Sequence, residues 1–523
     1  MEERTKREAA IVLSAVVLLS LAAGVALTQR GITPTLGTIA PLSSAYMQYL
    51  QNKAAGKVVS QTPDGYGLGY VPPPIQLSKR VAPTFLPAQI FPATYDLRTL
   101  GKVSPVEDQN PCGTCWDFAT FGSLESYLLP TSTTQFSENN LKNGHDFNEI
   151  NCCPNSTGNA MSAAAYLARW GINETDANGK PIHAGPVSLS CDPYDPGSCT
   201  SPATCPLAAH VQNVYFLPLK TSPTDNNVIK SAIMTYGGVW AGMDWVGPAQ
   251  GKTPYYNATP IQAANPYPTA AYYENTENVS SASGLQNASG LHAVTIVGWD
   301  DNYAATNFST PPPGNGAFIV KNSWGTSFGQ SGFFYVSYYD ISMGHVSLAV
   351  FTAEPTTNYQ TNYQYDPFGL CWQCGASTST AYGANVFTAT SDGALKAISF
   401  WAVEPGTQYT ANVYVNPAAN DPASGTLSST ISGTVPYTGY YTEPLNTTVP
   451  LTTGETFSVV IQFTTPAATN DPLSVPLQVK LQGYDDAAPT TPTGVSFVSP
   501  DGHTWTDVTT LGPSDAVCIH AFA

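Results

Sequence analysis

The chain has 523 residues, and 42% of them are hydrophobic, so it is long enough for two cores and too apolar to be disordered throughout. Charged residues make up only 11%, and 36 acidic residues outnumber 19 lysines and arginines, which argues against a nucleic-acid partner. Because a surface of uncharged polar residues changes its charge little as the pH falls, this composition favours an acidic working environment.

The first 29 residues form an export segment. Charged residues at 2–8 precede an uncharged, mostly apolar stretch at 9–29, as in a secretory signal or an N-terminal membrane anchor. We expect the rest of the chain to lie outside the cell or at its surface, contacting the membrane only through this segment. N-x-S/T sequons fit that compartment and predict a glycoprotein if the host glycosylates; they lie at Asn155, Asn173, Asn257, Asn278, Asn287, Asn307 and Asn446.

Residues 30–86 are rich in Pro, Gly and Gln, with one helical possibility at 42–54. This composition cannot make a core of its own, so we expect a propeptide or linker that lies on the following domain.

The next domain, at 87–353, places helices before strands. Helical spacing of apolar residues predicts helices at 115–129, 160–170 and 228–236. Short β-branched and aromatic stretches predict strands at 292–301, 316–324 and 332–340. This order is typical of an α+β fold. Beyond residue 354 only alternating segments remain, which predicts an all-β sandwich at 354–523.

Two of the ten cysteines, Cys112 and Cys115, are three residues apart. The polar, turn-forming residues before them argue against a redox motif, and the adjacency of Cys152 and Cys153 argues against a metal site. We therefore predict no metal and no cofactor. Cys115 opens a predicted helix, whose N-terminus lowers the pKa of a thiol and favours the reactive thiolate. It is the candidate nucleophile, and a structural disulfide is the other reading of the pair.

A nucleophilic cysteine needs a histidine, a group that orients this histidine, and donors for an oxyanion. His292 begins an apolar strand, and Asn322 ends another, beside Trp324, which can shield an Asn–His hydrogen bond from water. Gln109 offers a side-chain amide as an oxyanion donor, together with the backbone N–H of Cys115.

Four segments resemble papain-like cysteine peptidases in their residues and order: PVEDQNPCGTCWDFA, FSENNL, GLHAVTIVGWD and FIVKNSWGTSFGQSGFFYVSY. The resemblance covers roughly residues 90–350 and includes C-G-T-C-W, with Thr114 at the small position of the family signature. It implies Cys115 as nucleophile, His292 as imidazolium partner, Asn322 as its orienter and Gln109 as oxyanion donor. It also implies an endopeptidase that forms an acyl-enzyme in a cleft between a helical left lobe and a β-rich right lobe.

The resemblance extends to substrate contacts and cysteines. Gly158 matches the position whose backbone pairs with extended substrate, Thr157 replaces a usual glycine beside it, and Trp324 lies at the same site. Cys112 matches the structural cysteine of the family, bonded to Cys152 or Cys153. The other disulfide candidates are Cys191, Cys199, Cys205, Cys371 and Cys374, the last two in turn-like surroundings.

Three departures qualify the resemblance. Asp117 replaces a small apolar residue, and its charge would disfavour a nearby thiolate unless it is protonated or paired. His292 lies 177 residues after Cys115, against about 130–150 in the family, so loops are inserted, mainly at 190–207 and 247–290. The helical signature of plant and lysosomal propeptides is not visible in 30–86, so the sequence alone does not support autoinhibition by that mechanism.

The C-terminal segment, with CWQC and GVSFVSPDGHTWTDV, resembles the lectin-like domain that follows this peptidase domain in prokaryotic surface proteins. The expected partners are peptide or protein substrates and, through this domain, glycans. Tyr382, Trp401 or Trp505 could stack on sugars, although packing in a core is the better expectation. Two rivals are a non-catalytic surface adhesion protein with a degenerate peptidase domain, and a Cys-His cell-wall amidase. The intact set of Gln109, Cys115, His292 and Asn322 opposes the first, and KNSWG opposes the second.

Overall fold

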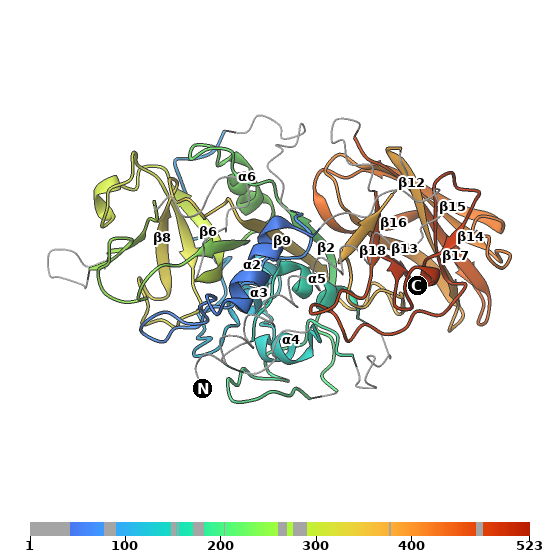
Figure 1. The fold of residues 1–523 in the computed structure, drawn as a ribbon, viewed down its shortest axis with the longest axis horizontal. Helices are drawn as coiled ribbons and strands as arrows, with labels where there is room; N and C mark the ends of the chain where they lie inside the picture. The colour runs from blue at the N-terminus through green and yellow to red at the C-terminus, as the bar shows by residue number, and fades with distance from the viewer. Residues whose placement is uncertain are drawn as a thin grey trace, which may run out of the picture.

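The structure is a computed structural model that describes residues 42–77, 90–147, 153, 156–170, 182–202, 204–259, 269–275, 290–375, 378–466 and 474–523. The predicted export segment, Cys152 and four of the sequons, at Asn155, Asn173, Asn278 and Asn287, lie outside these residues. Among the helices described, none has the length and apolar character needed to cross a bilayer. Figure 1 shows a helix-containing part on one side and an all-β C-terminal part on the other.

The helices of the first part are α3 (Cys115–Leu128), α4 (Glu138–Gly144), α5 (Ala160–Ala168) and α6 (Asn227–Tyr236). Helix α3 is buried on nearly every side and packs against three strands of the central sheet, β3, β6 and β9, which explains its apolar composition. Helix α5 begins with a capping box between Asn159 and Ser162. The three helices predicted in this part are confirmed, whereas α4 was missed because its sequence, ENNLKNG, is polar and short.

The strands of the first part are β1 (Thr94–Asp96), β2 (His210–Phe216), β3 (Val239–Asp244), β4 (Tyr256–Thr259), β5 (Thr269–Tyr272), β6 (Leu291–Asp300), β7 (Ala317–Lys321), β8 (Phe333–Ser337) and β9 (Ser347–Glu354). Those of the C-terminal part are β10 (Asn362–Tyr363), β11 (Trp372–Cys374), β12 (Thr380–Thr388), β13 (Gly393–Ala402), β14 (Gln408–Val415), β15 (Thr426–Thr434), β16 (Thr438–Leu451), β17 (Thr456–Thr464), β18 (Val475–Gln478), β19 (Ser496–Ser499), β20 (Thr506–Asp507), β21 (Ala516–Val517) and β22 (Ile519–Phe522).

One large sheet runs through both parts, in the order β10-β22-β13-β16-β2-β9-β3-β6-β7-β8-β5-β4, with β1 on β6. The parts join where β16 pairs with β2, with Gly439 opposite Tyr215. Gly439 has φ +147°, and a Cβ there would lie 2.0 Å from the Val214 carbonyl oxygen, so only glycine fits. Backbone pairing therefore couples the two parts directly.

The C-terminal part is a β-sandwich. Its six-stranded sheet, β15-β14-β17-β12-β19-β20, faces β13, β16 and β22 of the large sheet across a core that includes Phe400, Phe457 and Phe463. A third sheet, β11-β18-β21, completes this part, and the residues described here contain no α-helix. The predicted class, a two-lobed α+β fold followed by an all-β sandwich, is confirmed.

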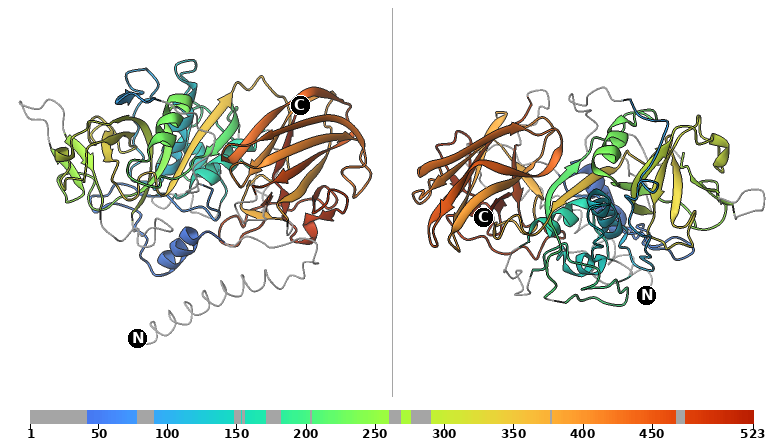
Figure 2. Two further views of the ribbon diagram at one scale, coloured as in Figure 1. Left: turned by 90° about the horizontal axis from the view of Figure 1, so that it is seen from above. Right: turned by 180° about the vertical axis from the view of Figure 1, so that it is seen from behind.

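An N-terminal segment, defined here as residues 42–77, lies across both parts. Its helix α2 (Ser44–Ala54) lies on the outside of the molecule, as Figure 2 shows. Tyr46 of α2 is buried against Tyr484 of the C-terminal part, with ring centroids 5.8 Å apart. The Ser43 hydroxyl caps α2 and donates to the Pro73 carbonyl, at 2.7 Å. After the helix, the chain continues in extended form toward Cys115.

Candidate active site

Cys115 is the first residue of α3, and its side chain is fully buried. The backbone amides of Ala293 and Gly69 hydrogen-bond to its sulfur. Burial raises the pKa of the Cys115 thiol to about 12, despite these amides. In this structure Cys115 is therefore a neutral thiol. Ala293, which hydrogen-bonds to its sulfur, directly follows His292 in the chain.

His292 and Asn322 are brought together by the antiparallel pairing of β6 with β7. His292 Nε2 lies 2.8 Å from Asn322 Oδ1, and the Trp324 ring stacks on the imidazole, with centroids 4.6 Å apart. Asn322 Oδ1 also accepts the Ser323 N–H, so it is the acceptor and Nε2 carries the proton. His292 Nδ1 has no hydrogen-bond partner among the described residues. Burial lowers the pKa of His292 to about 4, so Nδ1 is a free proton acceptor.

Gln109 is fully buried, and its amide is held in one orientation. Its Oε1 accepts the Ser323 hydroxyl at 2.5 Å, which links it to the residue after Asn322. Its Nε2 donates to the carbonyl oxygens of Cys112, at 2.7 Å, and Gly67, at 3.0 Å. The predicted oxyanion donor thus already binds a peptide carbonyl.

The Gly67 carbonyl belongs to the N-terminal segment, which hydrogen-bonds to Gln109, Trp324 and Gly158. The Gly67 oxygen also accepts the indole N–H of Trp324, at 3.2 Å. Further along, the Gly158 N–H donates to the Gly69 oxygen at 3.0 Å, and the Val71 N–H donates to the Gly158 oxygen at 2.9 Å. Gly158 therefore binds an extended chain through its backbone, while Thr157 beside it is half-buried. Here the bound chain is the protein's own.

The expectation from sequence concerned autoinhibition by the helical mechanism of plant and lysosomal propeptides. That expectation rested on a helical signature, whereas the contacts come from glycines in an extended stretch. A Cβ on Gly67 would lie 1.9 Å from the Cys112 oxygen, and one on Gly69 would lie 1.7 Å from the Gly113 oxygen. Only glycine allows the segment to approach the loop before Cys115 this closely.

The turn before these glycines is anchored on the β-rich side of the cleft. The Asp64 carboxylate accepts the backbone N–H groups of Ala249, at 2.8 Å, and Gln250, at 3.0 Å. Both belong to the predicted insertion 247–290, of which 260–268 and 276–289 lie outside the described residues. The described start of that insertion therefore contacts the chain in the cleft.

Tyr194 is a site residue that sequence reasoning missed. Its hydroxyl donates to the Gln109 carbonyl, at 2.7 Å, and lies 2.9 Å from the Thr114 hydroxyl. The loop that carries it is held by the Cys191–Cys205 disulfide and by Lys142, whose Nζ donates to two of the loop's carbonyls. Tyr194 therefore positions both ends of the loop between the oxyanion donor and the nucleophile. The sequence signal that could have pointed to Tyr194 was its neighbour Thr114, which occupies a position that is Ser or Ala in the family signature.

Asp117 is the residue whose charge was expected to conflict with the candidate nucleophile. It is fully buried, and neither carboxyl oxygen has a hydrogen-bond partner among the described residues. Burial raises the pKa of Asp117 well above its usual range, and the charge of Lys142 only partly offsets this. Burial therefore opposes the negative charge on Asp117 that was expected to disfavour a Cys115 thiolate.

The cysteines are partly as expected. Cys112 is bonded to Cys153, so of the two predicted partners the structure has Cys153, and Cys199 is also disulfide-bonded. The expectation for Cys371 and Cys374 is wrong, because both are free and buried. They lie at the two ends of a short extended stretch through β11, about 10 Å apart at the usual rise per residue, which is too far for a disulfide.

The aromatic side chains named as possible sugar platforms divide into two kinds. Trp401 is buried in the core between the two parts, so it cannot stack on a sugar. Tyr382 and Trp505 stay half-buried. Within the described ranges, no group of three or more His, Cys, Asp or Glu side chains is arranged to hold a metal ion.

Comparison with known proteins matches each of the two parts to a described family. Residues 91–351 match the family described as "Papain family cysteine protease", and residues 362–523 match "Lectin like domain". The chain is 26% identical over 263 residues to the probable cysteine protease RD19B of Arabidopsis thaliana, covering 48% of this chain and 59% of the relative. It is 27% identical over 272 residues to mouse procathepsin L, covering 51% of this chain and 66% of the relative. The chain thus spans less than two thirds of the length of these curated relatives.

Two solved structures contain both parts. The cysteine protease and lectin-like domains of Cwp84, a surface layer associated protein of Clostridium difficile, superpose with a TM-score of 0.71 at 24% identity, covering 93% of this chain and 97% of that one. A structure of clostridial Cwp84 after propeptide cleavage gives a TM-score of 0.64 at 25% identity, covering 82% of this chain and 98% of that one. The chain therefore belongs to the papain family of cysteine proteases through residues 91–351, and it carries a lectin-like domain after them.

Proposed function

We propose that this protein is an exported cysteine endopeptidase made in a latent form. The observation that carries the proposal is the pairing of His292 Nε2 with Asn322, which leaves Nδ1 without a partner among the described residues, while the next residue, Ala293, hydrogen-bonds to the Cys115 sulfur. Gln109 Nε2, bound to the Gly67 carbonyl, supplies the third element. A cysteine, an oriented histidine and a preset amide donor together are the machinery of acyl transfer.

In the proposed reaction, His292 Nδ1 takes the proton of Cys115 and the thiolate attacks a peptide carbonyl carbon. The carbonyl oxygen becomes an oxyanion, which the Gln109 amide and the Cys115 backbone N–H stabilise. The imidazolium, oriented by Asn322, then gives its proton to the leaving amine, and a thioester to Cys115 remains. Water, deprotonated by His292, hydrolyses this thioester and frees the enzyme.

The N-terminal segment keeps the enzyme latent because it excludes water from Cys115 and His292. With the thiol pKa raised to about 12 and the imidazole pKa lowered to about 4, both groups are neutral across the pH range between these values. Departure of the segment hydrates Cys115 and His292 and allows the ion pair to form. Propeptide cleavage in the related Cwp84 supports a maturation step of this kind here.

The test is proteolysis of a general protein substrate by the full chain, incubated at each pH from about 2 to 8. We expect the wild type to cleave and Cys115→Ala to be inactive, because no other group can form the thioester. Cys374→Ala is the matched control, since it removes a buried free thiol outside the cleft, and it should keep full activity. Equal cleavage by Cys115→Ala would contradict the proposal. A wild type inert at every pH would favour an adhesion protein, and cleavage of cell-wall peptides alone would favour an amidase.

We also propose that the lectin-like domain binds uncharged glycans on the outer face of its six-stranded sheet. The outward positions of its central strands β12, β14 and β17 carry no charged residue; they include Tyr382, Asn412, Tyr414 and Gln462. Gln462 Nε2 donates to the Tyr382 hydroxyl at 2.8 Å, and Trp505 lies edge-on to the Tyr382 ring. Aromatic faces beside amides suit neutral sugar rings.

A glycan array read with the full-length Cys115→Ala protein tests this second proposal. Tyr382→Ala should abolish binding to neutral glycans, because it removes both the ring and the partner of Gln462. Leu100→Ala, at an exposed position of the first part, should leave binding unchanged. If the Cys115→Ala protein gives no signal on the array, with or without Leu100→Ala, the proposal of glycan binding is wrong.

A further inference from the structure

The Tyr194 hydroxyl joins the two ends of the loop that runs from Gln109 to Cys115. It donates to the Gln109 carbonyl oxygen at 2.7 Å and lies 2.9 Å from the Thr114 hydroxyl. A phenol has one proton to give, and Tyr194 gives it to Gln109, so the Thr114 hydroxyl is the donor of the second bond. The two hydroxyls therefore form a chain of hydrogen bonds from the residue before Cys115 to the proposed oxyanion donor.

Thr114 uses its hydroxyl for this chain and not to cap α3. It directly precedes the helix, where a threonine side chain ordinarily accepts a backbone N–H of the first turn. Among the described residues, no backbone N–H donates to the Thr114 side chain in this way. The side chain is fully buried, and Tyr194 is the partner that the structure gives its hydroxyl. The hydroxyl at this position thus serves to orient Tyr194.

A different segment holds Gln109 at its other groups. The Gln109 N–H donates to the Ser323 carbonyl at 2.8 Å, and Gln109 Oε1 accepts the Ser323 hydroxyl at 2.5 Å. The Gln109 carbonyl accepts the Cys112 N–H at 2.9 Å in addition to the Tyr194 hydroxyl. Ser323 and Tyr194 therefore hold both the backbone and the side chain of Gln109, and this sets the direction in which its Nε2 points.

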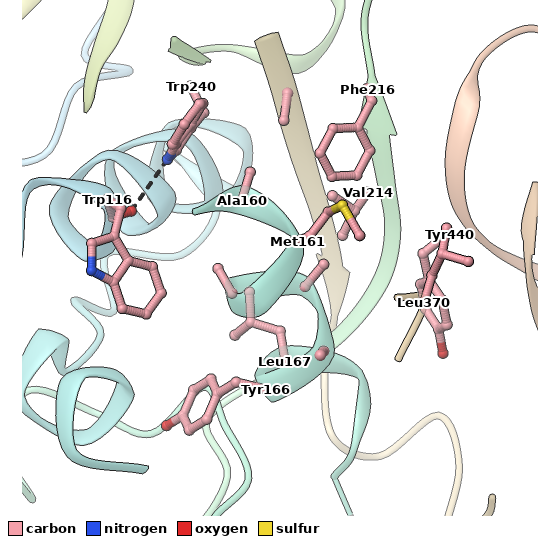
Figure 3. Close-up of a cluster of buried hydrophobic side chains, with 14 of the residues drawn as sticks. Trp116, Ala160, Met161, Tyr166, Leu167, Val214, Phe216, Trp240, Leu370 and Tyr440 are labelled. Carbon is pink, nitrogen blue, oxygen red and sulfur yellow. Dashed lines mark hydrogen bonds between the residues drawn. The ribbon is translucent and has the colours of Figure 1, made fainter. Parts of the chain in front are cut away.

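The Tyr194 ring is itself fixed on α3. It meets the Phe118 ring edge-on, with centroids 5.0 Å apart and an angle of 76°. Phe118 lies three residues after Cys115, on the same side of the helix. The start of α3 is tied to β3, because the Trp240 indole N–H donates to the Trp116 carbonyl at 3.2 Å, as Figure 3 shows. The Tyr194 hydroxyl is therefore held in a set place relative to Cys115.

The buried polar side chains of α4 hold the insertion that carries Tyr194. The Asn139 and Asn140 amides donate to the Asp192 carboxylate, at 2.7 and 3.1 Å. Lys142 Nζ donates to two carbonyl oxygens of the insertion, at 2.7 and 2.9 Å, and lies 5.4 Å from the centroid of the Tyr194 ring. These contacts explain why a helix as polar as ENNLKNG is buried. It binds the loop that brings Tyr194 to Gln109.

We propose that Tyr194, with Thr114 as its hydrogen-bond donor, is a positioning residue that aims the Gln109 amide at the oxyanion. This inference rests on the proposed peptidase function and adds a residue to it. Tyr194 acts on the reaction only through Gln109. The benefit is realised in the transition state, because the oxyanion charge develops there and an amide that is already aimed needs no reorganisation. Burial raises the pKa of the Tyr194 phenol, so this donor keeps its proton from acid to neutral pH.

The first experiment measures kcat and KM of the full chain on one fluorogenic peptide, at the pH at which the wild type cleaves best. Tyr194→Phe should lower kcat about tenfold and leave KM unchanged, an effect between the worth of one neutral hydrogen bond and the loss of an oxyanion donor. Thr114→Val should also lower kcat, whereas Thr114→Ser, which keeps the hydroxyl, should match the wild type. Tyr365→Phe is the matched control, since the Tyr365 hydroxyl donates to the Val386 carbonyl at 2.8 Å in the lectin-like domain, and it should keep full activity. A rise in KM alone, or a Thr114→Ser protein as slow as Thr114→Val, would overturn the inference and leave the peptidase proposal intact.

The second experiment reads the oxyanion donor without turnover. When a peptide aldehyde binds, the Cys115 sulfur bonds to the aldehyde carbon and the carbonyl oxygen takes the negative charge, as in the transition state. Iodoacetamide instead alkylates the same sulfur with loss of iodide and creates no oxyanion. Tyr194→Phe should therefore weaken aldehyde binding about tenfold, measured as protection of Cys115 against iodoacetamide, and leave the alkylation rate without aldehyde unchanged.

Equal aldehyde affinity in Tyr194→Phe and the wild type would overturn the inference. An aldehyde that protects neither protein would overturn it too, because Gln109 would then stabilise no oxyanion. If the wild type cleaves no peptide in the first experiment, the peptidase proposal fails, and the aldehyde affinities alone decide on the role of Tyr194.

Discussion

Replacing Gly69 by valine should convert the latent full chain into an open one. A Cβ at this position would lie 1.7 Å from the Gly113 oxygen and 2.3 Å from the Gly113 carbonyl carbon. The Gly113 backbone cannot retreat, because the Cys112–Cys153 disulfide and Tyr194 hold the loop on both sides. The N-terminal segment must leave instead. Water then reaches Cys115, and its thiol pKa falls from about 12 toward the ordinary value.

The measurement is the rate of Cys115 alkylation in the full chain, followed by mass spectrometry. Losing roughly 3 kcal/mol of segment binding would raise this rate about a hundredfold. Gly67→Val, whose Cβ would meet the Cys112 oxygen at 1.9 Å, should act in the same way. Gly393→Val is the matched control, since no atom lies within 4 Å of its added Cβ. An unchanged alkylation rate in a folded Gly69→Val protein would show that the segment does not depend on this close approach.

The folded protein should lose stability as the pH rises from about 4 to about 7. Burial raises the pKa of three carboxyl groups, Glu125, Asp244 and Asp485, to about 7 in each case. The same groups titrate near pH 4 in an unfolded chain. Between these values the folded state keeps protons that the unfolded state has lost. Their stabilisation is therefore fully present below about pH 4 and is lost toward pH 7, at roughly 4 kcal/mol for each group.

Other buried groups do not reverse this trend. Asp117 and Glu138, whose pKa values burial raises well above the usual range, act in the same direction. Two histidines act in the opposite direction, because burial lowers the pKa of His292 to about 4 and also lowers that of His210. Burial lowers the pKa of Lys220 to about 7, so its effect falls above that pH. Between pH 4 and pH 7, the carboxyl groups with raised pKa values therefore determine how the stability of the fold changes.

The midpoint of thermal unfolding, measured from about pH 3 to pH 8, checks this expectation. It should be highest near pH 4 and fall steadily toward pH 7. Asp244→Asn should flatten the decline, because the amide does not titrate, whereas Asp421→Asn, at an exposed position, should follow the wild type. A midpoint that rises from pH 4 to pH 7 would mean that these carboxyl groups are ionised in the folded protein, and it would remove this support for an acidic working environment.

The candidate catalytic residues were predictable because each is marked by local sequence. Cys115 opens a stretch with helical spacing, and His292 and Asn322 lie at the ends of apolar strands, so a window of about ten residues locates each one. Gly158 and Gln109 followed from the family motifs around them. The order of helices and strands also predicted the α+β class and the all-β C-terminal part.

What the sequence by itself determined is therefore the set of candidate site residues and the class of each domain, because these depend on periodicity and motifs within short segments. Only the tertiary structure placed Gly67, Gly69 and Tyr70 in the cleft, since those contacts join residues 42 or more positions apart along the chain. It alone brought Tyr194 to Gln109 and separated Cys371 from Cys374. The pattern of a segment encodes which of its faces is buried, whereas the partner of that face is decided by how distant segments pack together.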